Sequence, residues 1–381
     1  MIPEVNKIQV RYRNRSVGTI QPDPATGACT FAYEEQWLSE GFSISPTELP
    51  LKSGLFLADP DLFGGGFAVF EDSLPDGYGL YLLDRILKKQ GSSLWDLTPL
   101  QRLSLIGSSG MGALTYHPVL SGFGSQKEFD RLDELDLLQD EALKVFSEKG
   151  DGDESLLYYN SANSGGARPK TAVRFSDGSH WMVKFRHIYD EDSIGRNEYL
   201  YMQTAQECGI AIPRIALLQD RYFAVERFDI DTSGRRIHTL TAAALLKTDF
   251  RKQNIDYTNL LALTGFLTQD PAQVEEMFRR MVMNIIALNK DDHAKNFSFQ
   301  WLEDRWRLAP AYDITFSPKG SHGEHATSLF YNGNPTLDLV LKAGTGIRIR
   351  EKRCLEIIRE VETVCTRRLP VIKELSCNVN R

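Results

Sequence analysis

The sequence predicts an α+β protein in which a β-rich part is followed by a helical part. Short runs of alternating apolar residues, separated by turn residues, dominate the first part, whereas apolar residues recur at helical spacing in the last third. The chain has 381 residues, of which 42% are hydrophobic and 25% are charged, so it can bury a large core. This composition excludes disordered, collagen-like and coiled-coil proteins.

The first part contains strands, turns and short helices. Residues 8–17 alternate as a small β-hairpin would, and helical spacing predicts helices at residues 79–89, 98–105 and 132–146. An acidic stretch ends near residue 150, where we place a domain boundary. Residues 1–150 are therefore predicted to form an N-terminal β-rich subdomain.

The second part begins with strands and ends with helices. We predict strands at residues 171–175, 181–185, 211–218 and 221–228, with a helix at 193–208 that Gly209 ends. Further helices are predicted at residues 239–246, 257–267, 272–288 and 350–369. We assign residues 151–230 to a β-rich N-lobe and 231–381 to a helical C-lobe, the two-lobed arrangement that protein kinases use.

Charge and cysteine usage indicate a protein of the cytoplasm. Lys and Arg total 44 against 51 Asp and Glu, a net charge of −7 that argues against a protein whose main task is binding nucleic acid. The 5 cysteines form no C-x-x-C pair, which argues against a zinc site or a disulfide framework. The N-terminus lacks the apolar core of a signal peptide, and we expect no membrane span.

The densest polar cluster is the run NKDDHAKN at residues 289–296, directly after the apolar helix predicted at 272–288. So many polar groups cannot lie in a core, and a solvated loop ending a helix is the simplest interpretation. A predicted hairpin at residues 297–308 follows and should return Asp313 to the neighbourhood of Asn296.

Phosphoryl transfer from ATP requires residues of this kind. One carboxylate orients or deprotonates the attacking hydroxyl, and a carboxylate and an amide hold Mg²⁺. Four residues separate Asp291 from Asn296, as in the kinase motif H-R-D-x-x-x-x-N, and Asp313 would be the second metal ligand. Asp292 could compete for the role of base, but the spacing favours Asp291.

Candidate nucleotide-binding residues precede this loop in the order that kinases use. Lys184 lies in the strand-like run WMVKF, where an exposed strand lysine and a phosphate-binding lysine are both possible. Glu198 on the next helix could pair with Lys184 or could be an ordinary surface carboxylate. The run SANSGGARPK at residues 161–170 could cradle phosphates through its backbone amides, although it is no Walker loop.

Together these motifs resemble the HipA family, the toxin kinases of bacterial type II toxin–antitoxin modules. The matching segments are GGARPK, MVKF, RNE, VERFD, NKDDHAKNFSF and APAYDI, joined in the first part by FEDSLPDGYG and GSSGMGALTYHP. Several separate motifs in the same order cover about residues 5 to 335, which makes a chance match improbable.

The resemblance implies an ATP- and Mg²⁺-dependent protein serine/threonine kinase. Asp291 would be the catalytic base, Asn296 and Asp313 would coordinate Mg²⁺, and Lys184, supported by Glu198, would contact the ATP phosphates. The other ATP-contacting residues would be Gly165, Gly166, Ala167, Arg168, Pro169 and Lys170 in the phosphate loop, Glu226, Arg227 and Phe228 in the hinge, and His293, Lys295 and Tyr312 in the cleft.

The resemblance also implies partners. These are a HipB-like helix-turn-helix antitoxin, through which DNA would be contacted only indirectly, and a protein substrate such as glutamyl-tRNA synthetase. Where family toxins often carry an autophosphorylated serine, this chain has Asn163, flanked by Ser161 and Ser164 as candidate sites. The C-terminal region is short, so we expect some of the antitoxin or DNA contacts that longer relatives make through it to be missing.

Two other functions stay open at this point. A small-molecule phosphotransferase of similar fold would share the Asp291–Asn296 spacing, and a catalytically idle antitoxin-binding co-repressor would need none of these residues. His322 and His325 are separated by two residues, but two histidines without a third ligand are more typical of a polar loop than of a metal site.

Overall fold

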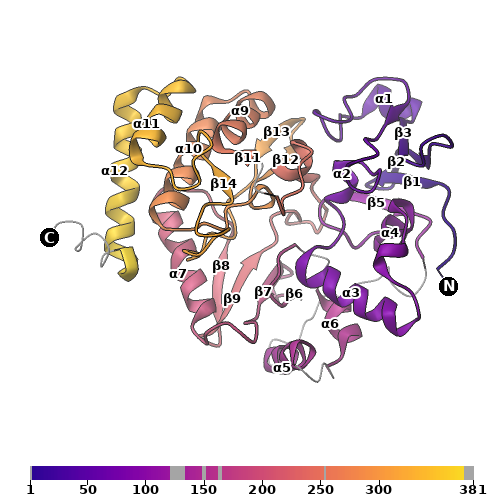
Figure 1. Ribbon diagram of the computed structural model, residues 1–381, viewed down its shortest axis with the longest axis horizontal. Coiled ribbons are helices and arrows are strands. Elements are labelled where there is room, and N and C mark those ends of the chain that lie inside the picture. The colour runs from indigo at the N-terminus through magenta and orange to yellow at the C-terminus, as the bar shows by residue number, and fades with distance from the viewer. Residues whose placement is uncertain (1, 121–133, 148–151, 162–164, 253–254, 373–381) are drawn as a thin grey trace. The chain divides into compact units, whose positions relative to one another are not determined.

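The structure is a computed structural model that describes residues 2–120, 134–147, 152–161, 165–252 and 255–372 (Figure 1). The chain divides into two compact units. The first comprises residues 1–192, 224–240 and 244–247, and the second comprises 193–223, 241–243 and 248–381. Three elements are divided between them: β9 (Tyr222–Glu226), β10 (Thr239–Thr241) and α8 (Ala242–Leu245).

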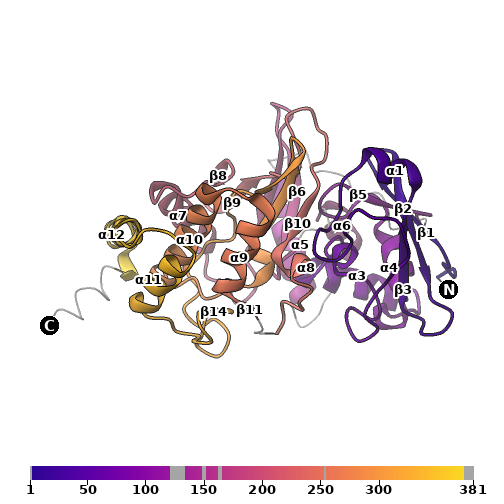
Figure 2. The same cartoon turned by 90° about the horizontal axis from the view of Figure 1, so that it is seen from above.

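The first unit begins with an antiparallel sheet of five strands in the order β4-β3-β2-β1-β5. Figure 2 shows β1, β2 and β3 side by side. The strands are β1 (Ile8–Tyr12), β2 (Arg15–Pro22), β3 (Cys29–Tyr33), β4 (Phe56–Leu57) and β5 (Leu114–His117). The hairpin predicted from residue 8 is confirmed, and its turn residues Arg13 and Asn14 have φ of 48° and 65°, as a tight hairpin turn requires.

The helices of the first unit are mostly short. They are α1 (Glu35–Glu40), α2 (Ala68–Glu71), α3 (Gly77–Lys89), η1 (Leu94–Asp96), α4 (Pro99–Ile106), α5 (Leu135–Phe146) and α6 (Glu154–Asn160). Three of them confirm the helices predicted from spacing. Thr98 explains the start of α4, because its hydroxyl accepts from the amide of Gln101 while the Gln101 side chain bonds back to Thr98.

A second antiparallel pair, β6 (Lys170–Arg174) and β7 (His180–Lys184), follows in the first unit. Both strands were predicted from sequence. Their register places Lys170 opposite Lys184 and Ala172 opposite Met182. Since side chains directly opposite in an antiparallel pair share a face, these four residues lie on one side of the sheet.

The second unit is mainly helical. It contains α7 (Ile194–Glu207), β8 (Ile215–Leu218), β11 (Ile255–Asp256), α9 (Tyr257–Thr268), α10 (Pro271–Ile286), η3 (Ala294–Asn296), β12 (Ser298–Leu302), β13 (Arg305–Leu308), β14 (Thr327–Ser328), α11 (Leu337–Gly346) and α12 (Glu351–Arg368). Helix α10 packs against α9 and α12 (Figure 1). Its apolar side chains are buried at Met277, Phe278, Met281 and Val282, as the helical spacing predicts.

One predicted helix is wrong. Residues 239–246 form the strand β10 followed by the single turn α8. The Thr-Leu-Thr sequence at residues 239–241 suits a strand, since β-branched side chains favour extended backbone, and β10 pairs with β12. Helix α11 was not predicted, although Thr336 caps its first turn.

No helix in the described part of the chain is long and apolar enough to cross a membrane.

Candidate active site

The polar run at residues 289–296 is a loop at the C-terminal end of the buried helix α10. The loop starts after Leu288, whose φ of 56° ends the helical backbone. It closes with the turn η3, in which the amide of Asn296 donates to the carbonyl oxygen of His293 at 2.8 Å. The packed helix α10 thereby fixes where this loop begins.

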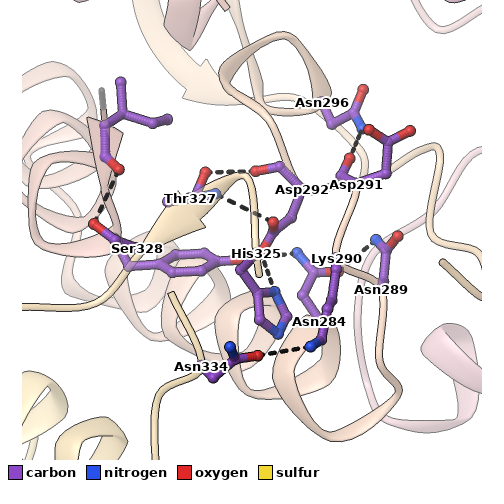
Figure 3. Close-up of polar contacts among 12 residues, drawn as sticks. Asn284, Asn289, Lys290, Asp291, Asp292, Asn296, His325, Thr327, Ser328 and Asn334 are labelled. Carbon is purple, nitrogen blue, oxygen red and sulfur yellow. Dashed lines mark hydrogen bonds and ion pairs between the residues drawn. The ribbon is translucent and has the colours of Figure 1, made fainter. Parts of the chain in front are cut away.

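The two adjacent acids of the loop differ in environment. Asp291 is exposed, whereas Asp292 is fully buried. Figure 3 shows Asp291 beside Asn296 and Asp292 beside Thr327 and His325. Of the two carboxylates, only that of Asp291 is accessible to a substrate.

Asn296 lies against Asp291, as the spacing of the two residues predicts. Its side-chain Nδ2 donates to the main-chain oxygen of Asp291 at 2.7 Å. This bond orients the amide, so that the Asn296 Oδ1, an oxygen of the type that Mg²⁺ prefers, faces away from that contact.

The hairpin of β12 and β13 returns the chain to the same loop. Its turn residues Glu303 and Asp304 both have positive φ, which suits a tight hairpin. After the hairpin, the hydroxyl of Tyr312 donates to the carbonyl oxygen of Lys295 at 2.5 Å and accepts from Ser298 at 2.6 Å. The hairpin therefore returns the chain to the loop at Tyr312 and Lys295, the residues that directly precede Asp313 and Asn296.

Asp313 follows directly and adopts an uncommon backbone. Its φ of 55° lies in the left-handed region, which aspartate tolerates better than most residues do. Asn289, 1% exposed, approaches the Asp313 carbonyl oxygen with its Nδ2 at 3.5 Å. The first residue of the loop and the backbone of Asp313 are therefore neighbours.

His293 and Lys295 share an aromatic neighbour. The imidazole ring of His293 lies 5.2 Å from the ring of Phe250, and the Lys295 ammonium lies 4.9 Å from the centre of the same ring. A lysine over an aromatic face is attracted by the negative charge of that face. Phe250, which no sequence motif indicated, positions both polar side chains.

The glycine-rich loop lies in the first unit and rests on the N-terminal end of α3. The amide of Gly166 donates to Oδ1 of Asp76 at 2.5 Å, and the amide of Tyr78 donates to the Gly166 carbonyl oxygen at 3.0 Å. The Lys170 ammonium bonds to the carbonyl oxygen of Gly165. Asp76 is 3% exposed, so a buried carboxylate holds this loop.

The shared face of β6 and β7 combines the two lysines with an apolar cluster. Ala172 and Met182 form this cluster, and Val225 of β9 packs against it. Lys184 is half-buried and lies next to Met182 on the same face. On this face the side chains of Lys170, Ala172 and Met182 are all buried.

Arg227 of the predicted hinge forms a buried ion pair. Its guanidinium donates to both carboxylate oxygens of Asp229, at 3.0 and 2.6 Å, and its amide donates to the His180 carbonyl oxygen at 2.8 Å. Burial would raise the pKa of Asp229, but the charges of Arg227 and Arg236 hold it below its ordinary value. Glu226 and Phe228 on either side are half-buried.

The remaining predicted residues lie in varied settings. Arg168 donates to both carboxylate oxygens of Asp190, at 2.9 and 3.3 Å. Ser161 is 1% exposed and donates to the Tyr158 carbonyl oxygen, while Ser164 lies outside the described residues. Glu198 is 3% exposed and is therefore no surface carboxylate. Lys184 and Glu198 belong to different units, and their pairing stays a prediction.

These features define the class of protein. An α+β chain in which a glycine-rich loop precedes a lysine-bearing strand pair, and an Asp-x₄-Asn loop follows a buried helix, has a kinase-like fold. Two family models match it: the HipA N-terminal domain over residues 8–117 and the HipA-like C-terminal domain over residues 162–368. The second model alone covers more than half of the chain. The chain therefore belongs to the HipA family.

Three known proteins illustrate what the chain is similar to. A chain of the Shewanella oneidensis MR-1 toxin–antitoxin system HipA, HipB and operator DNA complex superposes with a TM-score of 0.69, at 17% identity, over 96% of this chain and 90% of that one. At that identity the likeness establishes the fold. "Putative kinase Y4dM" of Sinorhizobium fredii is 24% identical over 87% of this chain and 82% of its own length. A "Putative kinase" of Haemophilus influenzae is 28% identical over 33% of this chain and 42% of its own length.

Proposed function

We propose that the protein is an ATP- and Mg²⁺-dependent protein serine/threonine kinase that acts as the toxin of a HipA/HipB-like module. The observation that carries this proposal is the exposed side chain of Asp291 in the 289–296 loop. Asn296 donates to the main-chain oxygen of Asp291, and Asn289, the first residue of the loop, contacts the backbone of Asp313. Family membership and the names of the two relatives support the same conclusion.

Asp291 would orient the hydroxyl of the acceptor and accept its proton as the new bond to phosphorus forms. An exposed carboxylate on a fixed backbone suits this role, because the proton must be taken at a defined place. His293 and Lys295, which both contact the ring of Phe250, would line the ATP cleft together with Tyr312.

The donor set fits a magnesium ion. Among the described residues no three His, Cys, Asp or Glu side chains gather as a metal cage. Mg²⁺ needs no such cage, since it is commonly held by one or two carboxylates together with substrate phosphates and water. Asn296 and Asp313 would supply the protein oxygens, and the bound ion would neutralise charge on the transferred phosphoryl group.

The first unit would bind the nucleotide. Residues Gly165, Gly166, Ala167, Arg168, Pro169 and Lys170, together with Lys184, would bind the phosphates, and Ala172, Met182 and Val225 would contact the purine. Glu226, Arg227 and Phe228 would form the adenine-contacting hinge, with Arg227 held by Asp229. The division at residues 150 and 230 into subdomain, N-lobe and C-lobe stays part of this proposal.

Labelled phosphate transfer tests the kinase function. The full chain is incubated with γ-labelled ATP and Mg²⁺, with or without EDTA, together with a cell extract or a panel of small hydroxylated molecules. Transfer to serine or threonine of a protein, lost with EDTA, supports the proposal. Transfer to small molecules alone would indicate a small-molecule phosphotransferase, and no transfer would indicate an idle binding module.

Growth and phosphoproteomics test the toxin role. Expression of the chain should arrest growth, a co-expressed helix-turn-helix antitoxin should relieve the arrest, and the Asp291→Ala variant should cause none. Comparison of phosphopeptides between the two strains identifies the acceptor, for which glutamyl-tRNA synthetase is our candidate. It also tests autophosphorylation at Ser161 or Ser164, and Ser161 would first have to leave its buried position. Normal growth with an active kinase would refute the toxin role only.

A further inference from the structure

Asp292, next to the proposed base, is a buried carboxylate with several donors. Its Oδ2 accepts from the Tyr257 hydroxyl at 2.5 Å. Oδ2 also accepts from Nδ1 of His325 at 2.8 Å, and Oδ1 accepts from the amide of Thr327 at 3.2 Å (Figure 3). A carboxylate only accepts, so Nδ1 of His325 carries the hydrogen. Burying this carboxylate would be costly without these bonds.

The donors belong to segments far apart in the sequence. Tyr257 is the first residue of α9, whereas His325 and Thr327 lie in the segment of residues 317–334 that follows Asp313. Thr327 also donates its hydroxyl to the main-chain oxygen of Asp292 at 2.5 Å. The side chain and the backbone of Asp292 are therefore both attached to the 317–334 segment.

Backbone bonds attach the preceding residues of the loop to the same segment. The amide of Ser317 donates to Leu288 at 3.1 Å, the amide of Lys290 donates to Ser317 at 3.1 Å, and the amide of Ala326 donates to Lys290 at 3.0 Å. The Lys290 ammonium adds bonds of 2.6 Å to the Gly323 carbonyl oxygen and to Oδ1 of Asn334. Residues 288–292 are thus bonded to the 317–334 segment, and Asp292 is also bonded to Tyr257 of α9, while the Asp291 side chain stays exposed.

A further chain of hydrogen bonds leads from Asp292 to Asp313. The Tyr257 hydroxyl accepts from Nδ2 of Asn284 at 3.0 Å, and Oδ1 of Asn284 accepts from Nδ2 of Asn289 at 2.9 Å. Asn289 reaches the backbone of Asp313. Burial, and then the charge of Asp292, raises the pKa of Tyr257 well above its ordinary value, so that the phenol stays a donor.

We propose that Asp292 and His325 are positioning residues that set the place of Asp291 by joining the 289–296 loop to the 317–334 segment through a buried hydrogen bond. In many kinases the segment after the metal-binding aspartate is ordered by a phosphorylated side chain paired with arginine. Here the Asp292–His325 contact supplies that order without modification. This inference rests on the proposed kinase function.

Histidine variants of the full chain test the proposal. In His325→Asn the side-chain amide can donate to Asp292 in place of Nδ1, whereas His325→Leu has no donor. The exposed His322 lies in the same segment, and His322→Leu is the matched control. Because small misplacements of catalytic groups are costly, we expect kcat of His325→Leu to fall by about 10- to 100-fold while KM for ATP changes less than about twofold. His325→Asn should restore most of kcat, and the control should match the wild type.

Hydrogen exchange gives a readout that does not depend on activity. The amides of Lys290, Ala326 and Thr327 should exchange about tenfold or more faster in His325→Leu than in the wild type or in His322→Leu. If wild-type chain transfers no phosphate, the proposed function fails, and the exchange rates still decide whether His325 orders the loop.

Either of two results would overturn the proposal. One is a His325→Leu chain with wild-type exchange at these amides. The other is a loss of kcat no larger than the unfolded fraction of the sample. Should His325→Leu fail to fold, Thr327→Val and Thr327→Ser replace it: valine lacks the hydroxyl that bonds to Asp292 and serine keeps it, so only the valine variant should lose kcat and exchange protection.

Discussion

Asp291 and Asp292 are neighbours in the chain and lie in opposite environments. Asp291 is exposed beside Asn296, whereas Asp292 is 0% exposed and accepts hydrogen bonds from Tyr257 and His325. A carboxylate enclosed by donors cannot reach the hydroxyl of an acceptor protein. We therefore assign chemistry to Asp291 and the placement of the loop to Asp292.

Replacing Asp292 should destabilise the fold. In Asp292→Asn the side chain loses one acceptor oxygen, which leaves a buried donor of Tyr257, His325 or Thr327 without its partner. We expect the free energy of unfolding to fall by about 2–4 kcal/mol in urea titrations. The matched variant Asp291→Asn should change it by less than about 0.5 kcal/mol, because its side chain is exposed. Equal effects of the two substitutions would contradict the assignment.

We expect Gly77 to be required for the packing of the glycine-rich loop against the start of α3. Its φ is +43°, and a Cβ there would lie 2.5 Å from the Gly166 carbonyl oxygen. Gly91 has φ +73° with nothing within 4 Å of its Cβ position, which makes it a control for backbone strain alone. We expect Gly91→Ala to cost about 1–2 kcal/mol of unfolding free energy and Gly77→Ala at least about 1 kcal/mol more.

The same pair of variants tests the link to nucleotide binding. Gly77→Ala should also raise KM for ATP, since the loop must move away from the added methyl group, whereas Gly91→Ala should leave KM unchanged. Equal unfolding free energies for the two variants, or an unchanged KM in Gly77→Ala, would contradict this account of the loop.

His238 should make the stability of the chain depend on pH. The ring is 1% exposed, packs near Phe42 and donates from Nε2 to the Ile44 carbonyl oxygen at 2.8 Å. Burial lowers the pKa of His238 from 6.5 to about 4. Between these pH values the unfolded chain binds a proton at this histidine that the folded chain does not. The stability contributed by the neutral, buried ring is therefore complete above pH 6.5 and is lost as the pH falls towards 4.

Urea unfolding at pH 7, 6 and 5 measures this contribution. His238→Gln keeps the donor to Ile44 but does not titrate. As the pH is lowered, the free energy of unfolding of this variant should therefore fall less steeply than that of the wild type, the two slopes differing by up to about 1.4 kcal/mol per pH unit. The exposed His322→Gln variant should keep the wild-type slope. A wild-type slope in His238→Gln would show that the histidine is not the group responsible.

Local patterns were sufficient for much of the fold. The sequence predicts the β12–β13 hairpin because turn residues separate two strand-like runs. It predicts the end of α7 because Gly209, which has φ +80°, stands where a helix-ending glycine is expected. The proximity of Asn296 to Asp291 also follows from local spacing, since the η3 turn ends at Asn296 and folds it back towards Asp291.

Contacts between distant residues were not predictable in this way. His325 was interpreted as part of a polar loop, and that interpretation is wrong: it is 2% exposed and bonds to Asp292, 33 residues away. The bond from Gly166 to Asp76 joins residues 90 positions apart. No periodicity marks a lone buried histidine or aspartate, because such residues are buried only once distant segments supply their partners.

The rate of phosphoryl transfer by Asp291→Asn relative to wild-type chain tests the central claim most directly. Asp338→Asn, at an exposed position in α11, is the matched control. With fold verified by thermal unfolding, we expect Asp291→Asn to lose about 10²–10⁴ in rate and the control to keep the wild-type rate. Transfer by folded Asp291→Asn at the rate of the control would contradict the assignment of Asp291 as the base.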